Sequence, residues 1–171
     1  FEMGLLSVKE WDARWIGGGG LLRKEFAVDR SVRRARVYVT ALGYYELKIN
    51  GQRIGTTVLD PAFTTYPKRI LYSTYDVTQQ VRKGENAIGV MLGGGWATNT
   101  SSRIKPYYPS PGLLLQMYLE LEGGAQLSVS SDAGWKSAAG PIVSASIYDG
   151  EVYDSRLEEP GWDQPGFDAS S

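Results

Sequence analysis

The sequence predicts an all-β protein, a two-sheet antiparallel β-sandwich with jelly-roll-like topology. In most segments apolar and polar residues alternate with a period of two, which is typical of half-buried strands. About eight or more short alternating runs are separated by turns rich in Gly, Pro and Asn, the pattern of sandwiches and jelly rolls. The 171 residues include 21 glycines and 42% hydrophobic residues, which suit tight turns and one domain with a sizeable core.

The strands follow from the alternation taken in chain order. In residues 34–40 small and apolar side chains occupy one face, and in residues 45–49 apolar residues alternate with Glu46 and Lys48. Asn50–Gly51 then predicts a hairpin, because both residues tolerate positive φ. Further strands are expected near 22–28, 69–76, 86–92, 113–121, 125–130 and 141–148, with a short piece near Trp135. The one helical candidate is a single capped turn at 76–81.

Period two also predicts which side chains face the core. We expect one hydrophobic layer between the sheets, formed by Val37, Val39, Leu47, Ile49, Leu115, Met117 and Leu119. The opposite faces carry polar side chains that we expect to face solvent, since charged groups are rarely buried unpaired: Arg34, Arg36, Glu46, Lys48, Gln116, Glu120 and the ring of Tyr118. A register slip of one residue would turn these polar residues inward.

The chain divides into a short segment, a body and a tail. Residues 1–20 end in four glycines and are expected to form a lead-in segment whose Trp11 and Trp15 dock on the body. Residues 21–165 form the sandwich, and residues 166–171 have the composition of a linker to further domains. Because the sequence starts with Phe1 and not Met, we interpret it as part of a longer protein.

Composition excludes several classes of function. Lys and Arg number 18 and Asp and Glu number 19, so the broad positive field of a nucleic-acid-binding protein is absent. No apolar run approaches the ~20 residues of a membrane-spanning helix. The chain has no cysteine and no histidine, which removes disulfides, thiolate catalysis and every triad that depends on His. Catalysis here would depend on carboxylates, Lys or Tyr.

The aromatic, proline-rich loop at 96–111 is the first candidate for a binding site. Its candidate residues are Trp96, Asn99, Arg103, Tyr107 and Tyr108. Trp and Tyr rings suit the apolar faces of sugars, and Asn and Arg suit sugar hydroxyls. A loop of this length also suits packing against a neighbouring domain, and both interpretations stay open.

The second candidate is a pair of carboxylates, Asp149 and Glu151. A spacing of two on a strand would place both on one face, where they could hold a cation or a sugar hydroxyl; the alternative is that they are turn and strand-end residues. If successive strands alternate in direction, residues 60–66, the 96–111 loop and residues 149–151 meet at one rim. We expect a carbohydrate-binding site there and no catalytic residue in the chain.

Several ordered stretches resemble the N-terminal β-sandwich domain of bacterial α-L-rhamnosidases, which is related to rhamnose-binding modules. They are Trp15–Ile16, Phe26, Ala35–Gly51, Leu59–Asp60–Pro61, Tyr66–Thr78, Gly84–Trp96, Ile147–Arg156 and Gly161–Trp162. The similarity covers nearly the whole chain. It implies a sandwich that precedes the catalytic domain of an inverting glycoside hydrolase releasing terminal L-rhamnose, with the catalytic acid and base in a downstream (α/α) barrel.

The resemblance implies the downstream catalytic domain as partner, with this domain shaping substrate access. The alternative is a lectin-like module for rhamnose-containing glycans. Some related sandwiches bind rhamnose through Ca²⁺, with an Asp–Asn pair where this chain has Asp60–Pro61. Asp60 is therefore the candidate metal ligand. Because proline removes a side-chain oxygen and Ca²⁺ takes six to eight oxygen ligands, we expect no cofactor.

Overall fold

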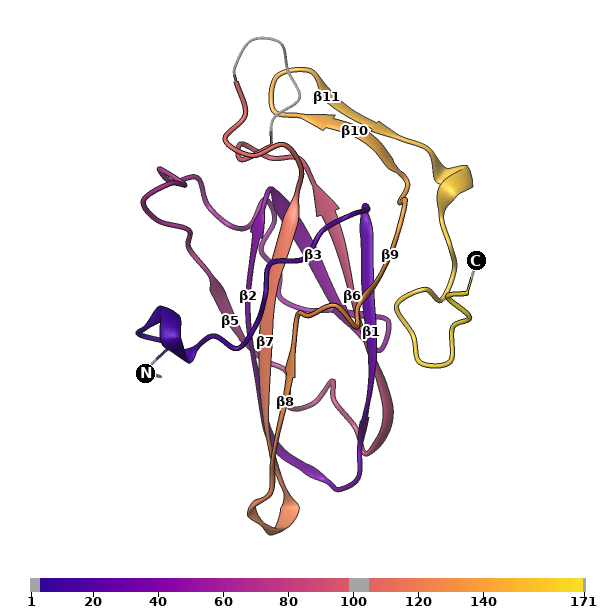
Figure 1. Cartoon of the computed structure of the whole chain (residues 1–171). Helices are drawn as coiled ribbons and strands as arrows, with labels where there is room; N and C mark the ends of the chain where they lie inside the picture. Colours follow the sequence, from indigo (N-terminus) through magenta and orange to yellow (C-terminus); the bar gives the residue numbers. More distant parts are fainter. Residues whose placement is uncertain (1–3, 99–104, 171) are drawn as a thin grey trace.

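The computed structural model describes residues 4–98 and 105–170. Within them the chain forms a two-sheet antiparallel sandwich (Figure 1), with five strands in the order β4–β3–β6–β1–β9 facing four in the order β5–β2–β7–β8. A separate two-stranded sheet joins β10 and β11. The chain passes between the two large sheets after β1, β2, β4, β5, β6 and β8. This repeated crossing confirms the expected jelly-roll-like sandwich.

The strands are β1 (Leu21–Val28), β2 (Val32–Leu42), β3 (Tyr44–Ile49), β4 (Gln52–Arg53), β5 (Ser73–Asp76), β6 (Gly84–Gly93), β7 (Gly112–Leu121), β8 (Gln126–Ser130), β9 (Lys136–Ala138), β10 (Ile142–Ser146) and β11 (Gly150–Tyr153). Short 3₁₀ turns lie at η1 (Val8–Glu10), η2 (Glu122–Gly124) and η3 (Ser155–Leu157). In this part of the chain no helix is long and apolar enough to cross a membrane. Residues 76–81 form a turn, in which Thr78 donates its backbone N–H to the Asp76 carboxylate at 3.0 Å.

The core lies between the sheets, where period two predicts it. The expected core residues are each at most 1% exposed: Val37, Val39, Leu47, Ile49, Leu115, Met117 and Leu119. The ladder pairs Val37 with Met117 in one sheet and Leu47 with Val90 in the other, so both sheets turn these side chains towards one layer. Asn50 (φ 52°) and Gly51 (φ 78°) make the expected hairpin turn after β3.

One outward-facing residue, Gln116, does not reach solvent. Its side chain is fully buried because the lead-in segment lies across β7 (Figure 1) and forms hydrogen bonds with the Gln116 side-chain amide. The Gln116 Oε1 accepts the backbone N–H of Asp12 at 2.6 Å and of Ala13 at 3.0 Å, and its Nε2 donates to the Glu10 carbonyl at 2.8 Å. The expectation of a solvent-facing Gln116 is wrong, because one amide can both donate and accept on an outer face.

The lead-in segment also contacts the body through apolar groups. The Trp11 ring packs edge-to-face on Tyr72, with centroids 5.5 Å apart, whereas Trp15 remains 43% exposed. Ile16 forms an antiparallel bridge with Leu113 at the start of β7. Residues 5–16 therefore lie along the four-stranded sheet side of the sandwich. Gly20 already contacts the other sheet, where its carbonyl accepts the backbone N–H of Leu92 on β6.

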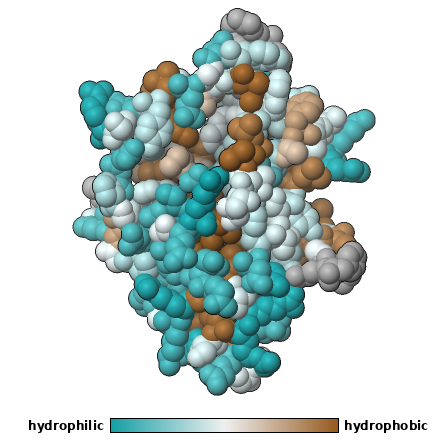
Figure 2. Space-filling view, turned by 180° about the vertical axis from the view of Figure 1, so that it is seen from behind, coloured by the Kyte–Doolittle hydropathy of each residue, from teal (hydrophilic) through white to brown (hydrophobic). Residues whose placement is uncertain are grey.

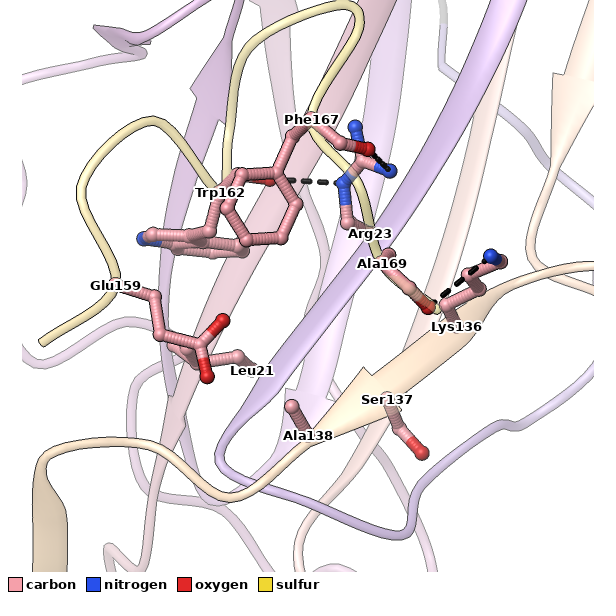
Figure 3. Close-up of a pocket in the computed structure, with 9 residues that line it drawn as sticks. All are labelled: Leu21, Arg23, Lys136, Ser137, Ala138, Glu159, Trp162, Phe167 and Ala169. Carbon is pink, nitrogen blue, oxygen red and sulfur yellow. Dashed lines mark hydrogen bonds between the residues drawn. The ribbon is translucent and has the colours of Figure 1, made fainter. Parts of the chain in front are cut away.

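At the other end of the chain, residues 159–169 pack on the outer face of the five-stranded sheet. Arg23 of β1 holds this segment: its Nε donates to the Trp162 carbonyl at 2.8 Å (Figure 3). An Nη of Arg23 also donates to the Gln164 carbonyl at 3.0 Å. The Trp162 ring lies on Gly89, where an added Cβ would sit 2.9 Å from the ring. The small pocket between Trp162 and Phe167 measures about 40 Å³, well below the ~300–1,000 Å³ of small-molecule sites.

Candidate functional site

A line of aromatic rings joins segments from distant parts of the sequence at one end of the sandwich. In the described part of the chain it runs through Tyr107, Tyr66, Phe63, Trp96 and Tyr148, with successive centroids 5.3, 5.8, 5.5 and 5.7 Å apart. All of these contacts are edge-to-face, the favourable geometry for aromatic pairs. Residues 60–66 meet the 96–111 loop as expected, and the third segment enters the line through Tyr148, directly before the expected residues 149–151. We call this end the apical rim.

Phe63 and Tyr66 belong to a loop that also contains Asp60. The Asp60 carboxylate connects this loop to both sheets through hydrogen bonds. Its Oδ2 accepts the hydroxyl of Tyr45 on β3 at 2.5 Å. The same oxygen accepts the hydroxyls of Ser73 at 2.6 Å and Tyr75 at 3.2 Å, both on β5. Burial, and then the hydrogen bond to Asp60, raise the pKa of the Tyr45 hydroxyl far above its usual range. Tyr45 therefore stays a neutral donor to Asp60.

This arrangement does not fit a calcium site. The Asp60 oxygen already accepts hydroxyl protons, whose positive ends oppose an approaching cation. Pro61 follows with no side-chain oxygen. Across residues 4–98 and 105–170, no three Asp or Glu side chains converge as metal ligands would. Asp60 acts here as a hydrogen-bond acceptor that joins two sheets and a loop.

A groove of about 490 Å³ lies between the β10–β11 hairpin and the outer face of the five-stranded sheet. Tyr44 and Glu46 of β3 and Met91 of β6 line the sheet side, and Glu151 and Tyr153 of β11 line the hairpin side. The volume is in the range of small-molecule sites, and the lining combines apolar surface with a few polar tips. Gly94 permits the close approach of the hairpin, because an added Cβ would lie 2.8 Å from the Ala145 carbonyl oxygen.

Two polar side chains that line the groove, Glu46 and Tyr153, are in contact with neighbours. Glu46 lies 3.4 Å from the Arg53 guanidinium. The Tyr153 hydroxyl donates to Glu158 at 2.8 Å. That hydrogen bond, with the nearby carboxylates, raises the pKa of Tyr153. The groove is therefore rich in carboxylate acceptors and tyrosine hydroxyls, which can exchange partners with a polar ligand.

The structure separates the residues that the sequence grouped. Trp96 lies half-buried within the ring line, and Tyr107 ends that line against Tyr66 and is 47% exposed. The backbone N–H of Tyr108 donates to the Ala97 carbonyl at 3.0 Å. Glu151 lines the groove. Asn99 and Arg103 lie outside the described residues.

Asp149 and Glu151 do not share a strand face. Asp149 lies in the turn before β11, where its carboxylate accepts the Ser146 hydroxyl at 3.1 Å. No motif or spacing in the sequence selects Tyr44, Met91 or Tyr153 as site residues. Alternation places Tyr44 on the outer face of β3, but nothing in the sequence indicates that the hairpin covers that face.

The chain is similar in sequence and in structure to known proteins. A family profile described as the α-L-rhamnosidase N-terminal domain matches residues 30–171. An α-L-rhamnosidase of Formosa agariphila is 39% identical over 172 residues, which cover 88% of this chain and 19% of that protein. The crystal structure of Streptomyces avermitilis α-L-rhamnosidase complexed with L-rhamnose superposes with a TM-score of 0.84 at 44% identity, covering 88% of this chain and 15% of that one.

A native rhamnosidase structure from Aspergillus terreus gives a TM-score of 0.91 at 42% identity, covering 99% of this chain and 22% of the other. The chain thus spans about a fifth of the length of the curated relative from Formosa agariphila. Both the resemblance inferred from the residues and the sandwich fold are confirmed. The chain belongs to the α-L-rhamnosidase N-terminal domain family.

Proposed function

We propose that this chain is a non-catalytic accessory domain of an α-L-rhamnosidase, an enzyme that removes terminal L-rhamnose from glycans. It packs on the catalytic domain and shapes the access of substrate. The observation that carries the proposal is the extent of the match: 88% of this chain aligns with only 19% of a relative named α-L-rhamnosidase. Four-fifths of such an enzyme is thus available for the chemistry.

The ionisable groups of the chain support a non-catalytic role. The sequence has no histidine or cysteine. Glycoside hydrolysis requires a carboxylic acid whose pKa is raised. Hydrogen bonds instead lower the pKa of several carboxyl groups in the described residues: Glu25, Asp76, Asp132, Asp154 and Asp168. These groups suit ion pairs and turns.

Two assays test the proposal. The isolated chain is expected to hydrolyse no rhamnoside, whereas deletion of residues 1–171 from the intact enzyme should lower its thermal stability or its turnover. An intact enzyme that folds, resists heat and turns over rhamnosides equally well without these residues would contradict the accessory role. Hydrolysis by the isolated chain would contradict its non-catalytic character.

Binding of rhamnose-containing glycans at the apical rim is a second candidate function. The observation that favours it is the groove of about 490 Å³, beside partly exposed rings that suit stacking on sugar faces. Trp96, Tyr107, Tyr108, Asp149 and Glu151 would contribute, with Asn99 and Arg103 on the same loop. Such sites bind weakly, with a Kd on the order of millimolar to tens of micromolar, or roughly 4–6 kcal/mol.

Calorimetry of the isolated chain with L-rhamnose and with rhamnogalacturonan fragments tests this second candidate. We expect heat of binding that is unchanged by EDTA or by added Ca²⁺, because the Asp60 oxygen is satisfied by hydroxyls. If high millimolar sugar produced neither heat of binding nor an NMR shift, this second candidate function would be excluded. Binding that requires Ca²⁺ would show that Asp60 rearranges to hold a cation.

A further inference from the structure

Exposed apolar side chains gather at the apical rim, and only two of them, Leu59 and Tyr153, also line the groove. Leu59, Phe63, Tyr107, Tyr148, Val152 and Tyr153 are each between 44% and 66% exposed; we call them the apical patch. Figure 2 shows the face that carries the five-stranded sheet, and its hydrophobic residues, in brown, are more frequent in the upper half. Single exposed apolar residues are ordinary on a protein surface, but a gathered set indicates an interaction site.

The β10–β11 hairpin is the part of this patch that stands furthest from the sandwich (Figure 1). Among the described strands it pairs only with itself, and every residue of β11 is exposed. Glu151 and Tyr153 line the groove, so alternation along β11 turns Val152, which is 57% exposed, to the opposite side. A lone two-stranded hairpin is marginally stable in water. An outward-facing valine on such a hairpin indicates a surface that another part of the protein covers.

The hairpin and the residues after it are acidic. Residues 142–160 carry Asp149, Glu151, Asp154, Glu158 and Glu159, with Arg156 as the one basic residue. Arg156 lies 2.6 Å from Asp154, so its charge is already compensated within the segment. A surface that meets this hairpin needs an apolar centre for Val152 and a rim of Lys or Arg side chains.

We propose that the β10–β11 hairpin is a docking arm for the remainder of the rhamnosidase chain, and that it meets a surface with an apolar centre and a basic rim. This inference rests on the proposed accessory function and names the surface by which the domain packs. Two observations identify the remainder of the chain as the partner of the hairpin. The hairpin is acidic, and in a relative named α-L-rhamnosidase about four-fifths of the chain lies outside the part that this chain matches.

Hydrogen exchange, followed by mass spectrometry, tests the arm directly. The amides of residues 142–153 are compared between this chain alone and the intact enzyme at equal concentration. We expect these amides to exchange at least about tenfold more slowly in the intact enzyme. The amides of β8, the far edge strand of the four-stranded sheet, serve as the reference and should exchange at equal rates. Equal rates at the hairpin would overturn the proposal.

A matched pair of substitutions assigns the protection to Val152. Val152→Lys places a positive charge against the basic rim, whereas Val8→Lys makes the same change at an 88% exposed valine of η1. In the intact enzyme, Val152→Lys should abolish the protection of the hairpin amides and Val8→Lys should leave it unchanged. Both variants of the isolated chain should unfold at the temperature of the parent chain. If the hairpin amides of the intact Val152→Lys enzyme remain protected, the docking-arm proposal is contradicted.

Further outcomes identify a different occupant. Slow exchange at the hairpin in the isolated chain, together with a dimer in sedimentation, would assign the surface to a second copy. Slow exchange in the isolated chain only when rhamnose is present would assign it to sugar. A third outcome separates the two proposals. If deletion of residues 1–171 impairs the enzyme, but the hairpin amides of the intact enzyme exchange as fast as in the isolated chain, the accessory function is supported and the docking arm is contradicted.

Discussion

The layer between the sheets and the apical rim use apolar side chains in opposite ways. Between the sheets Leu47, Ile49 and Met117 are at most 1% exposed, because ladder pairing fixes both the spacing and the facing of every second residue. At the rim Phe63 and Tyr107 remain about half exposed, at 57% and 47%, and meet other rings edge-on. The comparison indicates that the sheets supply stability and that the rim keeps surface available for contact.

The two regions also differ in how they are held. The core depends on burial of apolar area, at about 25 cal/mol per Å². The rim depends on a few polar contacts, chiefly the Asp60 carboxylate and its hydroxyl donors. Deletion of an apolar side chain between the sheets should therefore cost more stability than deletion of a polar side chain at the edges.

The largest effect is expected from Leu47→Ala. This change removes a buried side chain from the inter-sheet layer and should lower the free energy of unfolding by about 2–5 kcal/mol. Ile49→Val, two residues along on the same face of β3, is the matched control and should cost about 0.5–1.5 kcal/mol. Urea denaturation monitored by tryptophan fluorescence measures both. A Leu47→Ala chain as stable as the control would mean that β3 faces the other way.

Asp60→Ala should come next. It leaves the hydroxyls of Tyr45, Ser73 and Tyr75 without their acceptor, at a cost of about 1–3 kcal/mol. Asp60→Asn keeps one acceptor oxygen and should cost less. Because three hydroxyls already donate to the Asp60 Oδ2, we expect added Ca²⁺ to leave the melting temperature of the parent chain unchanged. A rise of several degrees with Ca²⁺ would overturn this assignment.

Lys48→Ala tests a polar contact on the outer face. The sequence suggests a solvated lysine whose loss costs well under 1 kcal/mol, but Lys48 lies 3.2 Å from Asp163, whose side chain is 9% exposed. Removing Lys48 leaves that carboxylate poorly compensated, so we expect a loss of about 1–3 kcal/mol. The exposed Lys83→Ala should stay within about 0.5 kcal/mol. Equal, small losses for both variants would show that the ion pair contributes nothing.

The smallest effect concerns pH. The pKa of Tyr45 is raised in the folded chain, so the fold prefers the neutral hydroxyl. Its contribution is complete below the ordinary tyrosine pKa of about 10 and is lost as the pH rises above it. Thermal unfolding should therefore show stability falling above about pH 10, and less steeply in Tyr45→Phe. Parallel pH profiles for the two chains would contradict a special role for this hydroxyl.

Much of the fold could be predicted from the sequence, because local rules apply where neighbours in sequence are neighbours on a strand. Alternation assigned Val37, Leu47 and Leu115 to the core, and Asn50–Gly51 to a turn with positive φ. Less of the candidate site was predictable. The strand count brought the loops to one rim, but the groove residues Tyr44 and Met91 carry no signal that a hairpin covers them.

The sequence by itself determined which faces of the strands are apolar and, through the absence of histidine and cysteine, which chemistry is missing. Only the tertiary structure decided what covers the outer faces. Gln116 is buried by backbone groups 103 and 104 positions away, and Asp60 takes its hydroxyl donors from strands of both sheets. Contacts of that range join residues through space, and no local period or propensity in the chain records them.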